Sequence, residues 1–204
     1  MKEIIIKIIN TRKQRREPVH KQMFALNESG KTCMNCTGVC CTAIANSMQI
    51  DLVQGLDLYI YLQRRNRFDK QLLEKNIQEN QIKIISVGKG GKQFRKRYTC
   101  PFYSGKSLGC TISINSKPYG CLAFNPIGAG VKEGENCRSY QESLEIREEM
   151  HESMEASLNR EVANEFKLID DRQAIPIKLL EIHQAIEKKI GEESFKSLLQ
   201  DFNE

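Results

Sequence analysis

Apolar side chains recur every three or four residues in several parts of the chain, which is the spacing of one face of an α-helix. Between residues 47 and 65 this spacing predicts a helix, with Ser47 or Asp51 available to cap its first turn. A second, shorter helix is expected over 69–80, before a run of β-branched residues begins.

The last third of the chain has the strongest helical pattern. A long amphipathic helix is expected over 146–169, and two shorter helices are expected over 175–190 and 195–202. Pro176 suits the first turn of the middle helix, and Gly191 suits the position just past its end. The stripe that we expect to face the core of the long helix contains Ile146, Met150, Met154, Leu158, Val162, Phe166 and Ile169.

The remaining segments have weaker patterns. Residues 82–87 and 94–99 flank a glycine-rich loop and predict a β-hairpin. The apolar start of the arm 1–32 predicts a strand or a short helix, because charged residues and a proline at 12–18 interrupt the apolar spacing. Residues 100–137 are rich in glycine and proline, so we expect turns with too little apolar content to hold themselves together.

The composition is that of an ordinary globular protein, with 204 residues of which 40% are hydrophobic and 28% charged. These values exclude collagen-like, low-complexity and wholly disordered chains. We expect no membrane-spanning helix, because the longest apolar runs are far shorter than about 20 residues. The start of the chain lacks the cleavage pattern of a secretory signal, so the expected compartment is the cytoplasm.

The net charge of +5 is unevenly distributed. Residues 1–32 carry a net charge of +5, whereas residues 138–204 carry −7. Basic groups at 12–16 and 95–97 are the places where RNA or an acidic partner would bind. Short basic runs of this kind are more typical of a solvated face, so we do not expect nucleic acid to be the main partner.

Cysteine is the residue that changes this picture most. A reducing compartment keeps ordinary thiols unpaired, so clustered cysteines there indicate metal ligands more often than disulfides. Packing as small apolar residues is the alternative, but it explains poorly why four cysteines fall within nine residues. The candidate metal ligands are Cys33, Cys36, Cys40, Cys41, Cys100, Cys110, Cys121 and Cys137.

A tetrahedral thiolate site takes four sulfurs, so eight cysteines allow two sites, or one cluster and one ion. Adjacent side chains point in different directions, which favours different sites for Cys40 and Cys41. Thiolate ligands suit both zinc and iron, so the sequence leaves zinc and an iron–sulfur cluster as alternatives. The spacing matches neither a zinc ribbon nor a ferredoxin.

Together these features predict an α+β fold. A small, loop-rich cysteine domain over 33–137, organised by metal and containing a short β-hairpin and helices, follows the basic arm 1–32. An acidic, all-helical segment over 138–204 completes the chain.

The runs CMNCTGVCC and CPFYSGKSLGCTISINSKPYGCLAF resemble the YkgJ-type cysteine-cluster family, over about half of the chain. The resemblance implies a zinc- or iron-chelating domain with all the cysteines above except Cys137 as ligands. A branch of the family is similar to flagellin lysine N-methylases, which implies an iron–sulfur cluster and S-adenosylmethionine. The chain departs from the family pattern at Ser113, at Lys117 where the family has arginine, and at Leu122.

Three hypotheses for function follow. The first is chelation of zinc or iron by the clustered thiolates, with Cys137 either completing a second site or remaining a buried thiol. The second is a methyltransferase-like or redox enzyme that modifies a protein substrate and uses S-adenosylmethionine. The third is a zinc-stabilised module that binds RNA or an acidic protein partner through its basic runs.

Overall fold

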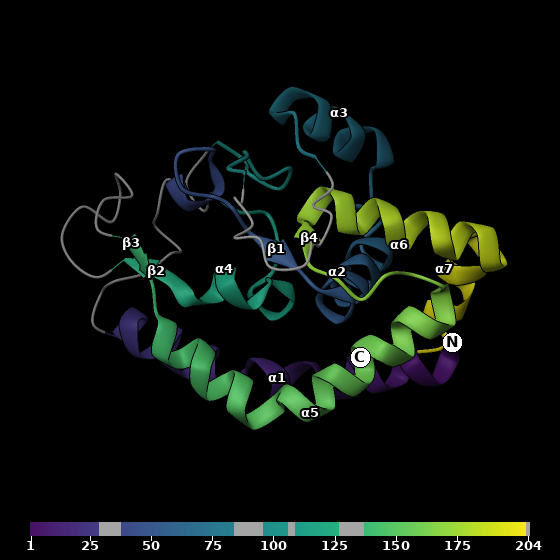
Figure 1. Ribbon diagram of the computed structural model, residues 1–204, viewed down its shortest axis with the longest axis horizontal. Helices are drawn as coiled ribbons and strands as arrows, with labels where there is room; N and C mark the ends of the chain where they lie inside the picture. The colour runs from purple at the N-terminus through teal and green to yellow at the C-terminus, as the bar shows by residue number, and fades with distance from the viewer. Residues whose placement is uncertain (29–37, 84–95, 106–108, 127–136, 203–204) are drawn as a thin grey trace, which may run out of the picture. The chain divides into compact units, whose positions relative to one another are not determined.

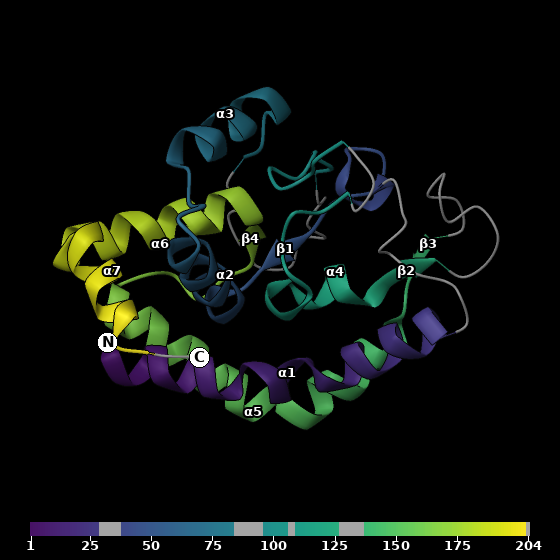
Figure 2. The same ribbon diagram turned by 180° about the vertical axis from the view of Figure 1, so that it is seen from behind.

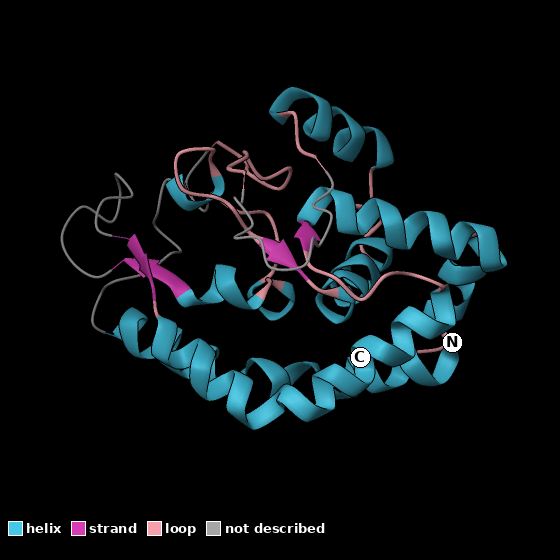
Figure 3. Cartoon of the chain, in the orientation of Figure 1, coloured by secondary structure: helices cyan, strands magenta, loops and turns pink. Residues whose placement is uncertain are grey.

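A computed structural model describes residues 1–28, 38–83, 96–105, 109–126 and 137–202, and most of them are helical (Figure 3). Two short antiparallel ladders pair β1 with β4 and β2 with β3, so the described residues form a mainly helical α+β structure. The elements are α1 (Lys2–Glu28), η2 (Val39–Cys41), β1 (Gln49–Ile50), α2 (Leu52–Arg64), α3 (Lys70–Asn80), η3 (Ile114–Ser116), α4 (Tyr119–Ala123), β2 (Phe124–Pro126), β3 (Cys137–Ser139), α5 (Gln141–Phe166), β4 (Gln173–Ala174), α6 (Ile175–Ile190) and α7 (Glu192–Gln200).

The chain divides into two compact units. Unit 1 comprises Met1–Arg12, Gln49–Phe94 and Ser153–Glu204, and unit 2 comprises Lys13–Met48 and Arg95–Glu152. The six described cysteines belong to unit 2. None of the helices in the described ranges has the length and apolarity needed to cross a membrane.

Unit 1 is built on the contact between α2 and α6, which lie side by side with α7 in Figures 1 and 2. Gly55 makes this contact close, because a Cβ at that position would lie 2.7 Å from Cδ1 of Ile182 and 2.8 Å from Cγ of Lys178. Two side chains satisfy the first turn of α2. The carboxylate of Asp51 accepts from the Gln54 amide, and Asn159 of α5 accepts from the Val53 amide at 2.9 Å.

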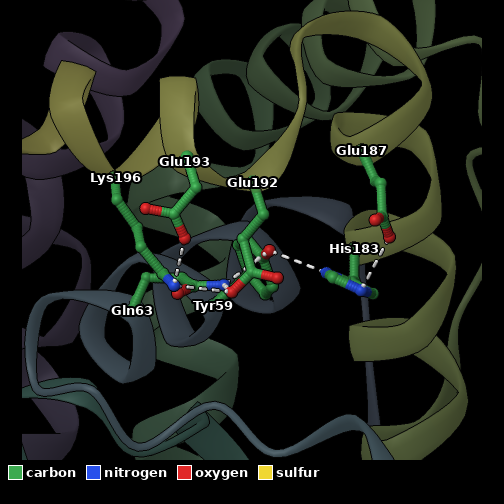
Figure 4. A network of polar contacts seen from close by, with 7 residues as sticks. All are labelled: Tyr59, Gln63, His183, Glu187, Glu192, Glu193 and Lys196. Carbon is green, nitrogen blue, oxygen red and sulfur yellow. Dashed lines mark hydrogen bonds and ion pairs between the residues drawn. The ribbon is translucent and has the colours of Figure 1, made fainter.

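A buried polar network joins α7 to α2 and α6 within unit 1 (Figure 4). The Gln63 side-chain amide donates to the Tyr59 hydroxyl at 2.7 Å and to Glu192 of α7 at 3.2 Å. The Tyr59 hydroxyl lies 3.0 Å from Nδ1 of His183, whose Nε2 lies 3.1 Å from Glu187. The Tyr59 hydroxyl thus accepts a hydrogen bond from Gln63 and also contacts His183. Burial raises the pKa of Tyr59.

The helices expected from apolar spacing are confirmed at α2, α3, α5, α6 and α7. Of the two expected N-caps for α2, Asp51 is the one present, and Gly191 lies between α6 and α7 as expected. Asp69, where the second helix was expected to begin, caps α3.

The buried face of α5 differs from the expected stripe in its first half. Ile146 and Met150 are exposed, whereas Arg147 and His151 are buried. The prediction that Ile146 and Met150 face the core is therefore wrong, as it is for Ile169, which lies beyond the end of α5 and is exposed. The apolar spacing located the helix, but polar side chains occupy part of its buried face, among them Arg147, which donates to the Arg15 carbonyl.

The arm 1–32 is not a strand or a short helix, because α1 runs through the charged residues and Pro18 as far as Glu28. Ile5 and Ile8 are buried in unit 1, and Val19 and Met23 pack with Leu122 and Ala123 in unit 2. The expectation takes the arginines at 15 and 16 as solvent-exposed residues that interrupt the apolar face. Both are buried in the structure and continue that face.

The predicted hairpin falls largely on residues 84–95, which lie outside the described part of the chain. In the turn-rich segment, the described residues contain η3, the short helix α4 and an isolated bridge between Tyr103 and Cys110. These short elements agree with the expectation of a turn-rich segment.

Lys178 gives the first test, because its charge is wholly buried in unit 1. Its ammonium group lies 2.5 Å from Asp171 and 2.9 Å from Glu181. We expect Lys178→Met to keep the packing of the stem but to lower the free energy of unfolding by about 3 kcal/mol, since the carboxylates lose their cation. Lys188→Met, at an exposed position of the same helix, should change it by less than about 0.5 kcal/mol. Equal effects in urea unfolding would contradict this account.

Candidate metal centre

Main-chain hydrogen bonds hold two cysteine-bearing segments of unit 2 against each other. The Cys100 amide donates to the Cys41 carbonyl at 2.7 Å. Farther along, the Tyr98 amide donates to the Asn46 carbonyl at 2.9 Å, and the Asn46 side chain donates back to the Tyr98 carbonyl at 3.0 Å. The Tyr98 hydroxyl donates to the Met48 carbonyl. Cys41 and Cys100 are therefore placed by backbone geometry.

A third segment meets the first through two glycines. Gly38 has a φ of 77°, and a Cβ on it would lie only 2.6 Å from Cα of Gly109 and 2.9 Å from Cε2 of Tyr103. A side chain at position 38 would therefore force the loop before Cys40 away from the loop before Cys110. The glycine provides both the left-handed conformation and the space for this approach.

The last two thiols are fixed by local structure. The Thr111 amide donates to the Phe102 carbonyl at 3.0 Å, and the Ile112 amide lies 3.4 Å from the Cys110 sulfur, to which it donates. Cys121 lies on α4, which begins after Pro118, a residue that suits the start of a helix.

Five thiols interact in this arrangement: those of Cys40, Cys41, Cys100, Cys110 and Cys121. The Cys41 thiol shares hydrogen bonds with Cys110 and Cys40, and these raise its pKa. The hydrogen bond from Cys41 lowers the pKa of Cys40. Burial, and then the charge of Cys110, raises the pKa of Cys100 to about 12.

Cys121 shows the same effect. Burial raises its pKa well above the usual range, and negative charge on Cys100 and Cys110 adds to the rise. Each thiolate would thus make its neighbours harder to ionise. Without a cation the raised pKa values of Cys41, Cys100 and Cys121 favour their protonated thiols, and a bound cation would reverse this preference.

Lys117 is a candidate site residue beyond the predicted cysteine ligands. It follows η3 and precedes Pro118. Its positive charge favours the thiolate forms of Cys40, Cys100 and Cys121, against the burial and thiol–thiol effects.

Not every predicted ligand is placed in this group. Cys33 and Cys36 lie outside the described residues, and Cys137 lies on β3, where its register partner is Pro126. Among the residues that the structure describes, no set of three or more His, Cys, Asp or Glu side chains is arranged to hold a metal ion. The described thiols are thus gathered but do not form a finished coordination sphere.

Arginines predicted to contact RNA have a different role. Arg15 donates to the Tyr119 hydroxyl at 2.5 Å, and Arg16 donates to the Lys117 carbonyl at 3.3 Å. The Arg147 guanidinium stacks on the Tyr119 ring, 3.4 Å from its centroid. Since Arg15 and Arg16 are at most 1% exposed, the expectation that this run presents a basic surface is wrong for both.

No family model, curated protein or solved structure matches the chain. The resemblance to the YkgJ-type family therefore rests on the cysteine-containing segments of the sequence.

The glycine contact yields a matched pair of variants. Gly105 has a φ of 68° and no atom within 4 Å of an added Cβ, so Gly105→Ala should cost about 1–2 kcal/mol from backbone strain alone. We expect Gly38→Ala to cost about 1–3 kcal/mol more, because it also forces the Gly109 backbone away. Urea unfolding measures both. Indistinguishable costs would show that the approach of the two loops is not tight.

The thiol pKa values predict a pH dependence for metal-free protein. The folded chain holds the Cys100 proton up to a pKa of about 12. This thiol therefore favours the folded state below about pH 8.5, the pKa of an unfolded cysteine, and the contribution is lost as the pH rises toward 12. Urea midpoints across this range should fall more steeply for the wild type than for Cys100→Ser. If the urea midpoints of the wild type and Cys100→Ser fall in parallel with pH, the raised pKa of Cys100 is contradicted.

Proposed function

We propose that the protein chelates a thiophilic metal, zinc or iron, through the clustered cysteines of unit 2. The observation that carries the proposal is the gathering of five thiols from three separate segments of the chain, which are joined by main-chain contacts. Simple burial of small apolar residues does not require thiols to contact one another.

The donor set fits such a metal in its chemistry. Other thiols and Lys117 are the side chains that shift the pKa values of Cys40, Cys41, Cys100 and Cys121. Thiolates select zinc, copper(I) and iron–sulfur clusters over magnesium or calcium. A bound cation would also remove the electrostatic cost of keeping several thiolates side by side.

Cys40, Cys41, Cys100, Cys110 and Cys121 would supply the described ligands. Cys33 and Cys36, which the resemblance includes among the ligand positions, would complete the sphere. A closed zinc site would stabilise the turn-rich part of unit 2, whereas an iron–sulfur cluster would bring redox chemistry. In either case the chain's own contribution is to hold the sulfurs in place and to balance their charge with Lys117.

Elemental analysis of protein purified without oxygen tests the proposal. We expect at least one zinc or iron per chain, and acid-labile sulfide as well if iron is present. Cys100→Ser and Cys110→Ser should each lower the metal affinity by more than about tenfold, because each removes a ligand. The matched control is Cys137→Ser, which removes a thiol from β3 and should leave the metal of the five-thiol group in place.

Two results would contradict chelation. One is wild-type protein that is folded and free of metal after anaerobic purification and also binds none of the added zinc or iron. The other is full metal content in both ligand variants.

A further inference from the structure

We propose that Cys41 and Cys110 form an oxidisable pair, which closes to a disulfide and thereby prevents metal binding at the thiol group. This inference rests on the proposed function, because it concerns the regulation of the same site.

The first step is the hydrogen bond between the two thiols. The Cys41 thiol is hydrogen-bonded to that of Cys110, although the residues are far apart in sequence. The Ile112 amide donates to the Cys110 sulfur at 3.4 Å, which orients that side chain. Behind the pair, the contact between Gly38 and Gly109 brings the two loops together. The backbone thus holds the reacting atoms close before any oxidation.

The second step is the choice of partner for Cys41, which is also hydrogen-bonded to Cys40. Consecutive Cα atoms are about 3.8 Å apart. Disulfides usually need Cα atoms about 4.4–6.8 Å apart. An adjacent pair falls short of this range, which leaves Cys110 as the hydrogen-bonded thiol that can pair with Cys41.

The third step is access for the oxidant. Cys41 and Cys110 are partly exposed, whereas Cys100 is buried at 8% exposure. A small oxidant such as hydrogen peroxide therefore reaches the pair more readily than it reaches Cys100. Susceptibility of cysteine to oxidation follows both exposure and thiolate character, and exposure is the factor that favours this pair, because the hydrogen bonds at Cys41 raise its pKa.

The chemistry balances with peroxide as the oxidant. The two S–H bonds break and one S–S bond forms, so the pair loses two electrons and two protons. The O–O bond of hydrogen peroxide takes up these electrons and protons and gives two molecules of water. Both sulfurs are then unavailable as thiolates, and a site that needs them loses two ligands.

The test uses the full chain, freed of metal by a chelator without oxygen and then treated with one equivalent of hydrogen peroxide. Mass spectrometry of non-reduced peptides should show one dominant link, between Cys41 and Cys110. Cys110→Ser should lower the yield of links to Cys41 more than tenfold, whereas Cys40→Ser should leave the Cys41–Cys110 link in place. In metal-loaded wild type, the same oxidant should release about one metal ion for each disulfide formed.

Differential alkylation of the wild type provides a readout that does not depend on any variant folding. Cys41 and Cys110 should lose reactivity toward the alkylating agent together. The proposal is overturned if the dominant link joins other cysteines, or if urea-unfolded protein forms the same link in the same yield. If the pair forms but anaerobic protein neither contains nor binds metal, the proposed function fails while the oxidisable pair stands. If metal is bound but the link joins other cysteines, the oxidisable pair fails while the proposed function stands.

Discussion

The approach of Gly38 to Gly109 is the constraint on which the thiol group depends. A Cβ added to Gly38 would lie 2.6 Å from Cα of Gly109, which leaves no room for a side chain. The Cys100 amide donates a hydrogen bond to the Cys41 carbonyl. Main-chain contacts therefore set the positions of the sulfurs, whether the thiols are protonated or ionised. Burial and mutual repulsion then oppose thiolates there, and Lys117 acts in the other direction. A site that is built by the backbone but opposed electrostatically is suited to a cation.

Much of the helical structure was predictable because its apolar residues keep a regular spacing. The caps at Asp51 and Asp69 and the glycine after α6 carried the same information locally. The same rule failed where polar groups are buried. Arg15 and Arg147 occupy core positions because each has a partner at Tyr119, and an apolar pattern cannot register that.

The membership of the site was predictable only in part. Cysteine spacing identified a group of candidate ligands, and the structure brings five of them together, with Cys137 placed on β3. Two features were beyond the sequence pattern. The glycine contact joins residues about seventy positions apart, and the effect of Lys117 depends on its folded position rather than on its neighbours in sequence.

X-ray absorption spectroscopy at the metal edge, on protein purified without oxygen, tests the central claim most directly. The account predicts a first coordination shell made of sulfur, at about 2.3 Å from the metal. A shell of oxygen or nitrogen ligands would show that the metal is bound elsewhere, and the thiol group would then not be the metal centre.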